Sequence, residues 1–255
     1  MRELTERQRA DVAFFDRYWT RQVDEGLEWI VPPDEVMFQR DLGRSLRYVL
    51  QRMGDLAGMR VLDLGCGTGD YTVVLARRGA WVTAVDLAPV ALEVTRRRAE
   101  RNGVGGRIEV ARMPAEALAL ADGAFDWVVG FGVLHHAQPS ALGAEARRVL
   151  RPGGRALFRE PLGLNPLLEF ARRHLPYRYK SRAPGDRFLR HADLQAVAAH
   201  FSTVHRRAFY LFSMISRALG KRERFPLLWS LDEGLLQRFP GLWRWCRYVV
   251  LEYEV

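Results

Sequence analysis

The chain has 255 residues, 48% of them hydrophobic, which is enough for the buried core of one large domain without disulfides or structural metals. Its two cysteines, Cys66 and Cys246, lie far apart, which excludes a disulfide framework and the spacing of a zinc site. The net charge of +9 comes almost entirely from arginines scattered through predicted helices, so we do not expect a nucleic-acid partner.

The first residues are charged and no apolar stretch follows them, so no signal peptide is expected. No run of 18 apolar residues is free of charge, so we expect no transmembrane helix. With two unpaired cysteines, these features predict a cytoplasmic protein.

Short apolar runs alternate with amphipathic segments between about residues 45 and 160, a pattern typical of strand-helix-strand units around a parallel sheet. Strands are expected at residues 60–64, 81–86, 107–111, 125–131 and 155–159, and helices at 71–78, 89–102 and 141–150. Asn102-Gly103 and Pro152-Gly153-Gly154 are the predicted ends of the last two helices. A helix at 192–200 and strands at 203–212 and 245–253 complete a Rossmann-like α/β fold with seven strands.

Three segments fall outside this pattern, and we expect them to cover the sheet edge within a single domain of residues 1–255. Residues 1–44 form an N-terminal cap with an aromatic cluster, ahead of a cofactor-binding core at 45–160. Residues 161–190 and 213–244 are predicted substrate-cap insertions. In the first insertion, arginines between 172 and 190 either bind a substrate anion or form a solvated helix face. In the second, apolar residues recur near helical spacing and predict a helix buried against the sheet.

The first strand runs directly into Gly65-Cys66-Gly67-Thr68-Gly69. Glycines at a strand-to-helix turn allow a tight backbone and the close approach of a ligand to free helix N–H groups. The spacing is G-x-G-x-G, whereas dinucleotide-binding turns have G-x-G-x-x-G, which argues against a nicotinamide enzyme. Asp86 follows Gly65 by 21 residues, where a carboxylate accepts ribose hydroxyls, although it also suits the N-cap of the next helix.

Asp63 and this turn, Asp86, Phe125-Asp126 and Arg151-Pro152-Gly153-Gly154 together resemble the ordered motifs of class I S-adenosylmethionine-dependent methyltransferases, of the small-molecule type. The resemblance implies helices on both faces of a mostly parallel sheet, an antiparallel last strand, S-adenosylmethionine as cofactor and S-adenosylhomocysteine as product. No metal is implied. Pro114 stands where the family usually has an acidic adenine contact. The cofactor contacts that it implies are Asp63, Gly65, Cys66, Gly67, Thr68, Gly69, Asp86, Leu87, Met113, Ala115, Glu116, Phe131 and Tyr18, with Trp19 beside Tyr18 closing over the cofactor.

His135 and His136 follow the fourth strand, at the sheet edge where open α/β sheets bind ligands. An imidazole is suited to removing a proton from a hydroxyl near neutral pH. The family resemblance implies that His135 pairs with Glu160 after the fifth strand, with His136 a second candidate. The alternatives are that both histidines cap the loop or pack under the cofactor, and that Glu160 neutralises an arginine.

The sequence therefore predicts methyl transfer to oxygen or carbon of an apolar or partly anionic metabolite, in a secondary-metabolite or lipid pathway. A nucleic-acid methyltransferase is an alternative suggested by charge alone. Phe131-Gly132-Val133-Leu134 stands where base-amino methyltransferases have an Asn/Asp-Pro-Pro-Tyr/Phe tetrapeptide. A nonenzymatic protein that binds the cofactor without turnover is the other alternative, and the departure at Pro114 is its support.

Overall fold

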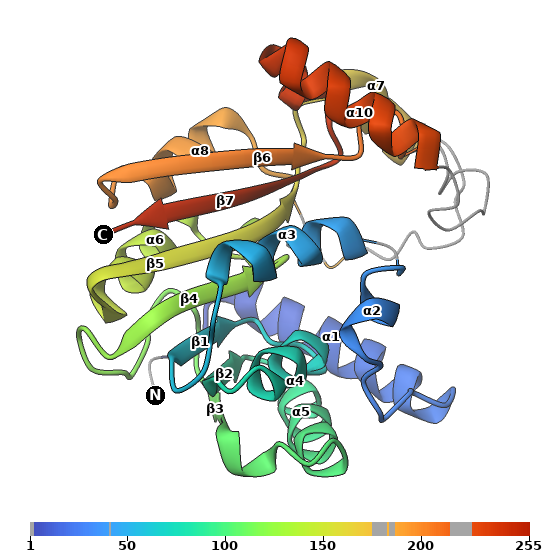
Figure 1. Cartoon of the computed structure of the whole chain (residues 1–255). Helices are drawn as coiled ribbons and strands as arrows, with labels where there is room; N and C mark the ends of the chain where they lie inside the picture. Colours follow the sequence, from blue (N-terminus) through green and yellow to red (C-terminus); the bar gives the residue numbers. More distant parts are fainter. Residues whose placement is uncertain (1–2, 41, 175–182, 184–186, 215–225) are drawn as a thin grey trace.

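A single seven-stranded sheet forms the centre of the protein (Figure 1). The computed structural model describes residues 3–40, 42–174, 183, 187–214 and 226–255. The sheet order is β3-β2-β1-β4-β5-β7-β6, and β7 runs antiparallel to both of its neighbours while the other pairs are parallel. The strands are β1 (Arg60–Leu64), β2 (Trp81–Asp86), β3 (Ile108–Arg112), β4 (Phe125–Phe131), β5 (Leu150–Pro161), β6 (Thr203–Phe209) and β7 (Tyr248–Glu254). The predicted Rossmann-like sheet with its antiparallel last strand is confirmed.

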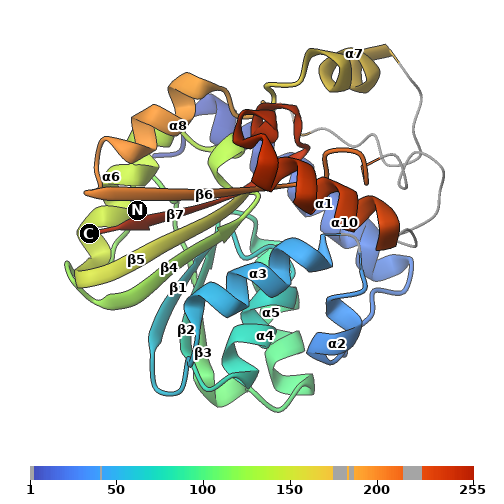
Figure 2. The ribbon, with the colours of Figure 1, turned by 45° about the horizontal axis from the view of Figure 1, so that its top comes forward.

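Helices cover both faces of this sheet, as predicted. Figure 2 shows α3, α4 and α5 on one side of the sheet, with α6 and α8 on the other. The helices are α1 (Glu6–Asp24), α2 (Asp34–Met37), α3 (Gly43–Met53), α4 (Asp70–Arg77), α5 (Pro89–Arg101), α6 (Pro139–Val149), α7 (Pro166–His174), α8 (His191–Ala198) and α10 (Pro226–Arg238), with 3-10 turns η1 (Gly105–Arg107), η2 (Leu134–His136) and η3 (Pro240–Trp245).

The predicted end of a helix just before Pro152-Gly153-Gly154 is confirmed, because α6 ends at Val149. The predicted start of the next strand at residue 155 is wrong, because the chain enters β5 at Leu150 and these residues lie inside the strand. Leu150 pairs with Phe125, but the next partner of β4 is Arg155, so the residues between form an irregularity in the ladder. Proline has no N–H to donate and is tolerated at such a position.

The last two strands are also shorter than predicted. β6 ends at Phe209 because Tyr210 has a φ of +66°, which turns the backbone out of the extended conformation. β7 begins at Tyr248 because residues 240–245 form η3 instead.

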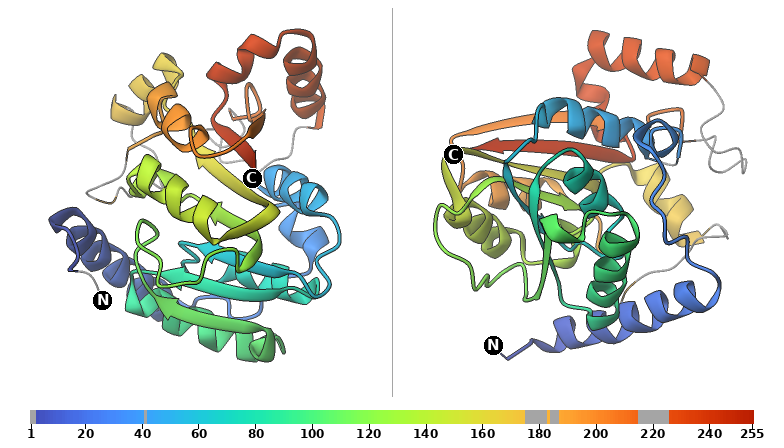
Figure 3. Two further views of the ribbon diagram at one scale, coloured as in Figure 1. Left: turned by 90° about the vertical axis from the view of Figure 1, so that its left-hand side faces the viewer. Right: turned by 60° about the horizontal axis from the view of Figure 1, so that its bottom comes forward.

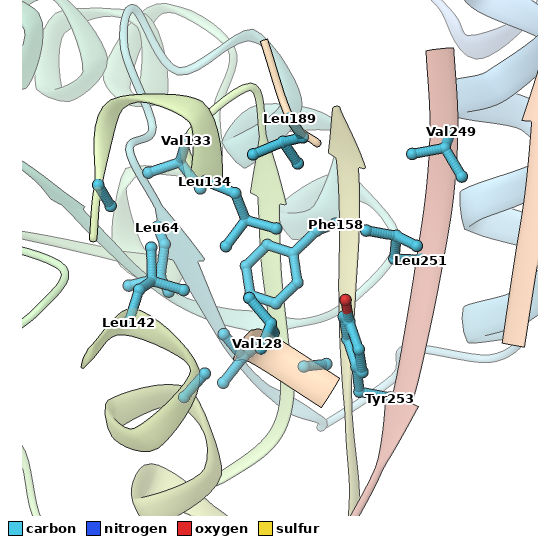
Figure 4. Close-up of a cluster of buried hydrophobic side chains, with 14 of the residues drawn as sticks. Leu64, Val128, Val133, Leu134, Leu142, Phe158, Leu189, Val249, Leu251 and Tyr253 are labelled. Atoms are coloured by element: carbon cyan, nitrogen blue, oxygen red, sulfur yellow. The ribbon is translucent and has the colours of Figure 1, made fainter. Parts of the chain in front are cut away.

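Two apolar clusters fill the opposite faces of the sheet. On the α6 and α8 side, Phe158 lies among Leu64, Val128, Leu134 and Tyr253 (Figure 4). On the α3 and α4 side, the cluster includes Val49, Val73, Val129 and Leu157. Because consecutive residues of a strand face opposite sides, β4 and β5 supply both clusters. Burying each large apolar side chain contributes roughly 1.5–3 kcal/mol.

The N-terminal segment forms α1, which runs along the outside of the domain (Figure 3). A capping box between Thr5 and Gln8 starts the helix. Asp16 accepts a hydrogen bond from the backbone N–H of Val90 at 3.1 Å, so α1 caps the first turn of α5. Within residues 1–44, α1 is therefore a helix docked on α5.

The predicted helix in residues 213–244 is present as α10. The prediction that its apolar residues are buried against the sheet is wrong for some of them. Leu227 is 85% exposed, and Phe239 after the helix is exposed as well. The buried residue of α10 is Asp232, whose carboxylate accepts hydrogen bonds from the backbone of Leu211, Phe212 and Ser213. A polar anchor therefore attaches this helix to the chain after β6.

Across these described helices, none is both long and apolar enough to cross a membrane.

Candidate active site

The glycine turn lies where the sheet order reverses, between the carboxyl ends of β1 and β4. The backbone N–H groups of Gly65 and Cys66 donate to Val85 O at 2.8 and 3.0 Å, which ties the turn to β2. Gly69 has a φ of +76°, and a Cβ there would lie 2.8 Å from Thr95 Oγ1. The turn therefore requires glycine at this position for both conformation and space.

A buried arginine that the sequence did not single out holds the other side of the turn. Arg98 is 3% exposed and donates to the Thr68 carbonyl at 3.1 Å and to the carboxylate of Asp70. Its neighbours Arg96 and Arg97 instead pair with Glu93 on the surface. Thr95 and Arg98 are three residues apart on α5 and therefore share one face of the helix. This spacing is the feature of the sequence that could have predicted their common contact with the glycine turn.

Asp86 contacts both the turn and the start of α5, but the expectation that it is the N-cap of that helix is wrong, because the N-cap is Ala88 and no side chain caps the helix. Its Oδ2 accepts from Gly67 N at 3.0 Å, and its Oδ1 accepts from Ala88 N at 2.9 Å ahead of α5. Burial raises the pKa of this carboxyl. Each oxygen has a further lone pair, so the carboxylate can also accept hydrogen bonds from the two hydroxyls of a ribose.

Asp63 lies beneath the turn with one oxygen unsatisfied. Its side chain is 1% exposed, and Oδ2 accepts from the Thr72 hydroxyl at 2.6 Å. Oδ1 is buried with no hydrogen-bond partner among the described residues. Burial raises the pKa of Asp63 to about 7. An unpartnered buried carboxylate oxygen suits a cationic donor, and the ammonium of the cofactor's methionine portion is such a group.

The predicted adenine contacts Met113, Ala115 and Glu116 follow β3, whose last residue, Arg112, pairs with Asp86 of β2. Met113 and Ala115 are partly buried against the apolar core, and the carbonyl of Leu87 accepts from Arg112. Glu116 is already engaged, because its carboxylate accepts hydrogen bonds from Arg7, Gln8 and the backbone of Gln138. Glu116 therefore fastens the start of α1 to this edge.

Helix α1 carries its aromatic residues over the turn. The Cζ2 atom of Trp19 lies 3.5 Å from where a Cβ on Gly67 would be. The ring of Tyr18 is 4.7 Å from that of Trp19, and Phe15 meets His136 edge-on at 5.2 Å. Trp19 is thus in contact range of the turn, with Tyr18 beside it.

Two surface hollows of the described structure lie elsewhere. One is lined by residues of β3 and α5, and the other lies between β6 and α10. Neither includes the glycine turn or the histidines.

His135 and Glu160 form the predicted pair. The imidazole Nδ1 of His135 lies 2.7 Å from Glu160 Oε2, and both side chains are buried. Glu160 Oε1 accepts from the backbone N–H groups of Val133 and Leu134 at 2.8 and 3.0 Å. A carboxylate with these donors holds the proton of His135 on Nδ1, which leaves Nε2 as the basic nitrogen.

The loop that carries His135 contacts the glycine turn. A Cβ on Gly65 would lie 2.8 Å from Val133 Cγ2, so the two loops are packed directly together. Phe131, at the end of β4, stacks on Tyr71 in the first turn of α4 at 4.2 Å between ring centroids. The structure thus brings the predicted base and the predicted methionine site to one edge.

His136 differs from His135. Burial, reinforced by the neighbouring His135, lowers the pKa of His136 to about 3. Its Nδ1 is buried without a hydrogen-bond partner in the described part of the chain. A histidine with such a low pKa is neutral and a weak base at working pH, and its edge contact with Phe15 suits a packing role.

Comparison with known proteins agrees with this geometry. Residues 61–154 match the family model of the methyltransferase domain. The chain is 41% identical over 123 residues to ubiquinone biosynthesis O-methyltransferase of Xanthomonas oryzae pv. oryzae (strain PXO99A), covering 48% of this chain and 50% of that protein. It is 44% identical over 127 residues to demethylmenaquinone methyltransferase of Thermus thermophilus, covering 46% and 56%. The chain therefore spans about half the length of the curated relatives it matches.

Similarity of fold extends over the whole chain. The geranyl diphosphate C-methyltransferase of Streptomyces coelicolor A3(2) superposes with a TM-score of 0.66, covering 100% of this chain and 99% of that one at 18% identity. Residues 61–154 are therefore a methyltransferase domain, within a chain that has the class I methyltransferase fold. S-adenosylmethionine is the cofactor of this class, as the sequence predicted.

Proposed function

We propose that this protein transfers a methyl group from S-adenosylmethionine to a hydroxyl of a small-molecule acceptor. The observation that carries the proposal is the buried His135–Glu160 pair, which is packed against the cofactor turn through Val133 and Gly65. The two curated relatives support it, since their names describe methyltransferases of ubiquinone biosynthesis and of demethylmenaquinone.

The glycine turn with Asp63 and Asp86 binds the cofactor, and the loop that carries His135 supplies the base. The cofactor supplies an activated methyl group when bound. Asp86 and Asp63 bind its ribose and ammonium groups, and the glycine turn lets its backbone come close. Holding donor and acceptor in line supplies most of the rate enhancement in such a transfer.

The proton of the acceptor goes to His135. Glu160 orients the imidazole and keeps the proton on Nδ1, so that Nε2 is the nitrogen that accepts the proton of the acceptor. The carboxylate then stabilises the imidazolium that forms. A positioned base is needed where a hydroxyl must lose its proton, which favours oxygen over carbon as the acceptor atom. His136 and Glu116 act in this scheme through packing and through the attachment of α1.

A binding and turnover experiment tests the proposal. The full chain should bind S-adenosylhomocysteine in calorimetry and transfer labelled methyl from S-adenosylmethionine to members of a panel of phenols. His135→Asn should keep the affinity for S-adenosylhomocysteine and lose roughly 10²–10⁴ in turnover. Failure to bind S-adenosylhomocysteine would contradict the cofactor, and full turnover in His135→Asn would contradict the base.

We also propose the cytoplasm as the place of this reaction. Cys66 and Cys246 are both free thiols, which is typical of a reducing compartment. Reduced thiols in protein alkylated directly in cells would support the assignment.

A further inference from the structure

A second charged residue lies at the carboxyl end of β5, next to Glu160 in sequence. Arg159 is 5% exposed, and its backbone pairs with Phe131 of β4. Its guanidinium donates to the Tyr71 hydroxyl at 3.0 Å, and it lies over the rings of Tyr71 and Phe131 at 4.8 and 5.1 Å from their centroids. Arg159 is thus enclosed by aromatic groups.

No carboxylate of the described residues pairs with this cation. Its Nε is buried and has no hydrogen-bond partner within the described chain. Among the described residues, the two other buried arginines are different, because Arg98 pairs with Asp70 and Arg172 pairs with Glu169. Arg159 is therefore a buried cation that lacks an anionic partner in this part of the protein.

Burial of Arg159 has a free-energy cost, because it removes a charge from water. The contacts with Tyr71 and Phe131 offset part of this cost. An anion at the unpartnered Nε face would stabilise the cation further, because a guanidinium binds a carboxylate or phosphate through two parallel hydrogen bonds.

The location connects this cation with the reaction. Tyr71 follows the glycine turn in the first turn of α4, and Gly132, in the loop that leads to His135, donates its N–H to the Arg159 carbonyl at 2.9 Å. Arg159 therefore lies at the same sheet edge as the turn and the base. Glu160 is next to it in the strand and faces the opposite side of the sheet.

We propose that Arg159, with Tyr71, binds a carboxylate or phosphate group of the methyl acceptor. The inference rests on the proposed function and gives it a substrate class, a hydroxylated metabolite that carries an anionic group. The methionine carboxylate of the cofactor offers the same chemistry from a second source, so the test must separate the two.

The first arm measures anion binding to protein saturated with S-adenosylhomocysteine. Benzoate, phenyl phosphate and inorganic phosphate are titrated by calorimetry, with benzamide as the neutral match for benzoate. We expect at least one anion to bind, benzamide to bind more weakly than benzoate, and Arg159→Gln to weaken anion binding tenfold or more. Absence of binding by all three anions, or equal binding to Arg159→Gln, overturns the proposal.

Arg155→Gln is the matched control, because it removes the same charge from the same face of the same strand. Arg155 lies over Trp127 but is 40% exposed in its side chain and pairs with Glu252 and Glu254. Its replacement should leave anion affinity unchanged. Arg159→Lys keeps the positive charge but lacks the planar guanidinium. We expect this variant to bind the anion more tightly than Arg159→Gln. Such a difference would show that the loss in Arg159→Gln comes from the charge and not from misfolding.

The second arm tests the cofactor as the source of the anion. S-adenosylhomocysteine has the methionine carboxylate and 5′-methylthioadenosine lacks it. Equal affinity of wild type and Arg159→Gln for S-adenosylhomocysteine supports the acceptor as the ligand. Loss of affinity for S-adenosylhomocysteine alone, with 5′-methylthioadenosine unaffected, overturns that assignment. If wild type binds neither, the proposed function itself fails, so the two failures are distinguishable.

Discussion

His135 Nδ1 and Glu160 Oε2 lie 2.7 Å apart, and the second oxygen of the same carboxylate accepts two backbone N–H groups from the loop that carries His135. The carboxylate therefore holds the backbone of the loop in place. It also determines which imidazole nitrogen carries the proton. This arrangement makes the tautomer of His135 a property that mutation can change.

Glu160→Gln should lower turnover about 10²–10⁴-fold while leaving the affinity for S-adenosylhomocysteine unchanged. The glutamine oxygen can still accept from Val133 and Leu134, but its NH₂ then faces Nδ1 and moves the imidazole proton to Nε2. Single-turnover rates with labelled cofactor provide the measurement, and nitrogen chemical shifts of His135 report the tautomer. A normal rate with the altered tautomer would remove Glu160 from the mechanism.

The buried carboxyl of Asp63 should make the ligand-free protein less stable as pH rises. Its folded pKa of about 7 lies above the ordinary value of 3.8, so folding favours the protonated form. The stabilisation is complete below about pH 4 and is lost as pH rises through 7, by about 1.4 kcal/mol per pH unit between the two values. Urea unfolding from pH 4 to 8 measures this slope.

Asp63→Asn provides the comparison for that slope, because asparagine keeps an oxygen for Thr72 and cannot ionise. Asp86 contributes a slope of the same sign, since burial raises its pKa too, and this part should persist in the variant. Identical slopes in wild type and Asp63→Asn would show that Asp63 is not the titrating group.

Cofactor binding should change the fluorescence of Trp19. Its ring is in contact range of Gly67, in the turn that we propose binds the cofactor. Titration with S-adenosylhomocysteine is expected to shift the tryptophan emission in wild type but not in Trp19→Phe. Trp81→Phe is the control, because Trp81 is exposed at the opposite end of β2 and lies under Arg107. An equal shift in wild type and Trp19→Phe would place the change at another tryptophan.

Arg98→Met should destabilise the fold by about 1–3 kcal/mol, since it removes a donor to the Thr68 carbonyl and the cation that pairs with Asp70, which keeps only its hydrogen bond from the Thr68 hydroxyl. We take the lower part of the range for buried pairs because Asp70 is one-third exposed. Arg97→Met, which breaks a surface pair with Glu93, should cost under about 1 kcal/mol. Chemical denaturation compares them, and equal losses would mean that Arg98 has no special role at the turn.

The regular part of this fold was predictable because its signals are local. Strand β1 and the turn after it follow from a short apolar run and glycines whose spacing leaves few backbone choices. The position of Asp86 followed from its spacing after the glycine turn, and the pairing of His135 with Glu160 was implied by the family resemblance. These predictions required no knowledge of how helices are rotated on the sheet.

The residues that sequence analysis missed depend on that rotation. Arg96, Arg97 and Arg98 are chemically identical, and only the packing of α5 against the turn buries the third. Arg159 looks like any charged residue in a strand until Tyr71 and Phe131 are placed around it. Glu116 was predicted near adenine, and its contacts with α1 arise from a helix more than 100 residues away in sequence.

The alternation of side chains along β5 has an evolutionary consequence. Arg159 and Glu160 are consecutive, yet the thickness of the sheet separates them, with Phe131 and Tyr71 on one side and His135 on the other. A substitution at position 159 can alter the preference for an acceptor while the base keeps its geometry. New acceptors are thus open to descendants of this protein through single changes that leave its proton transfer intact.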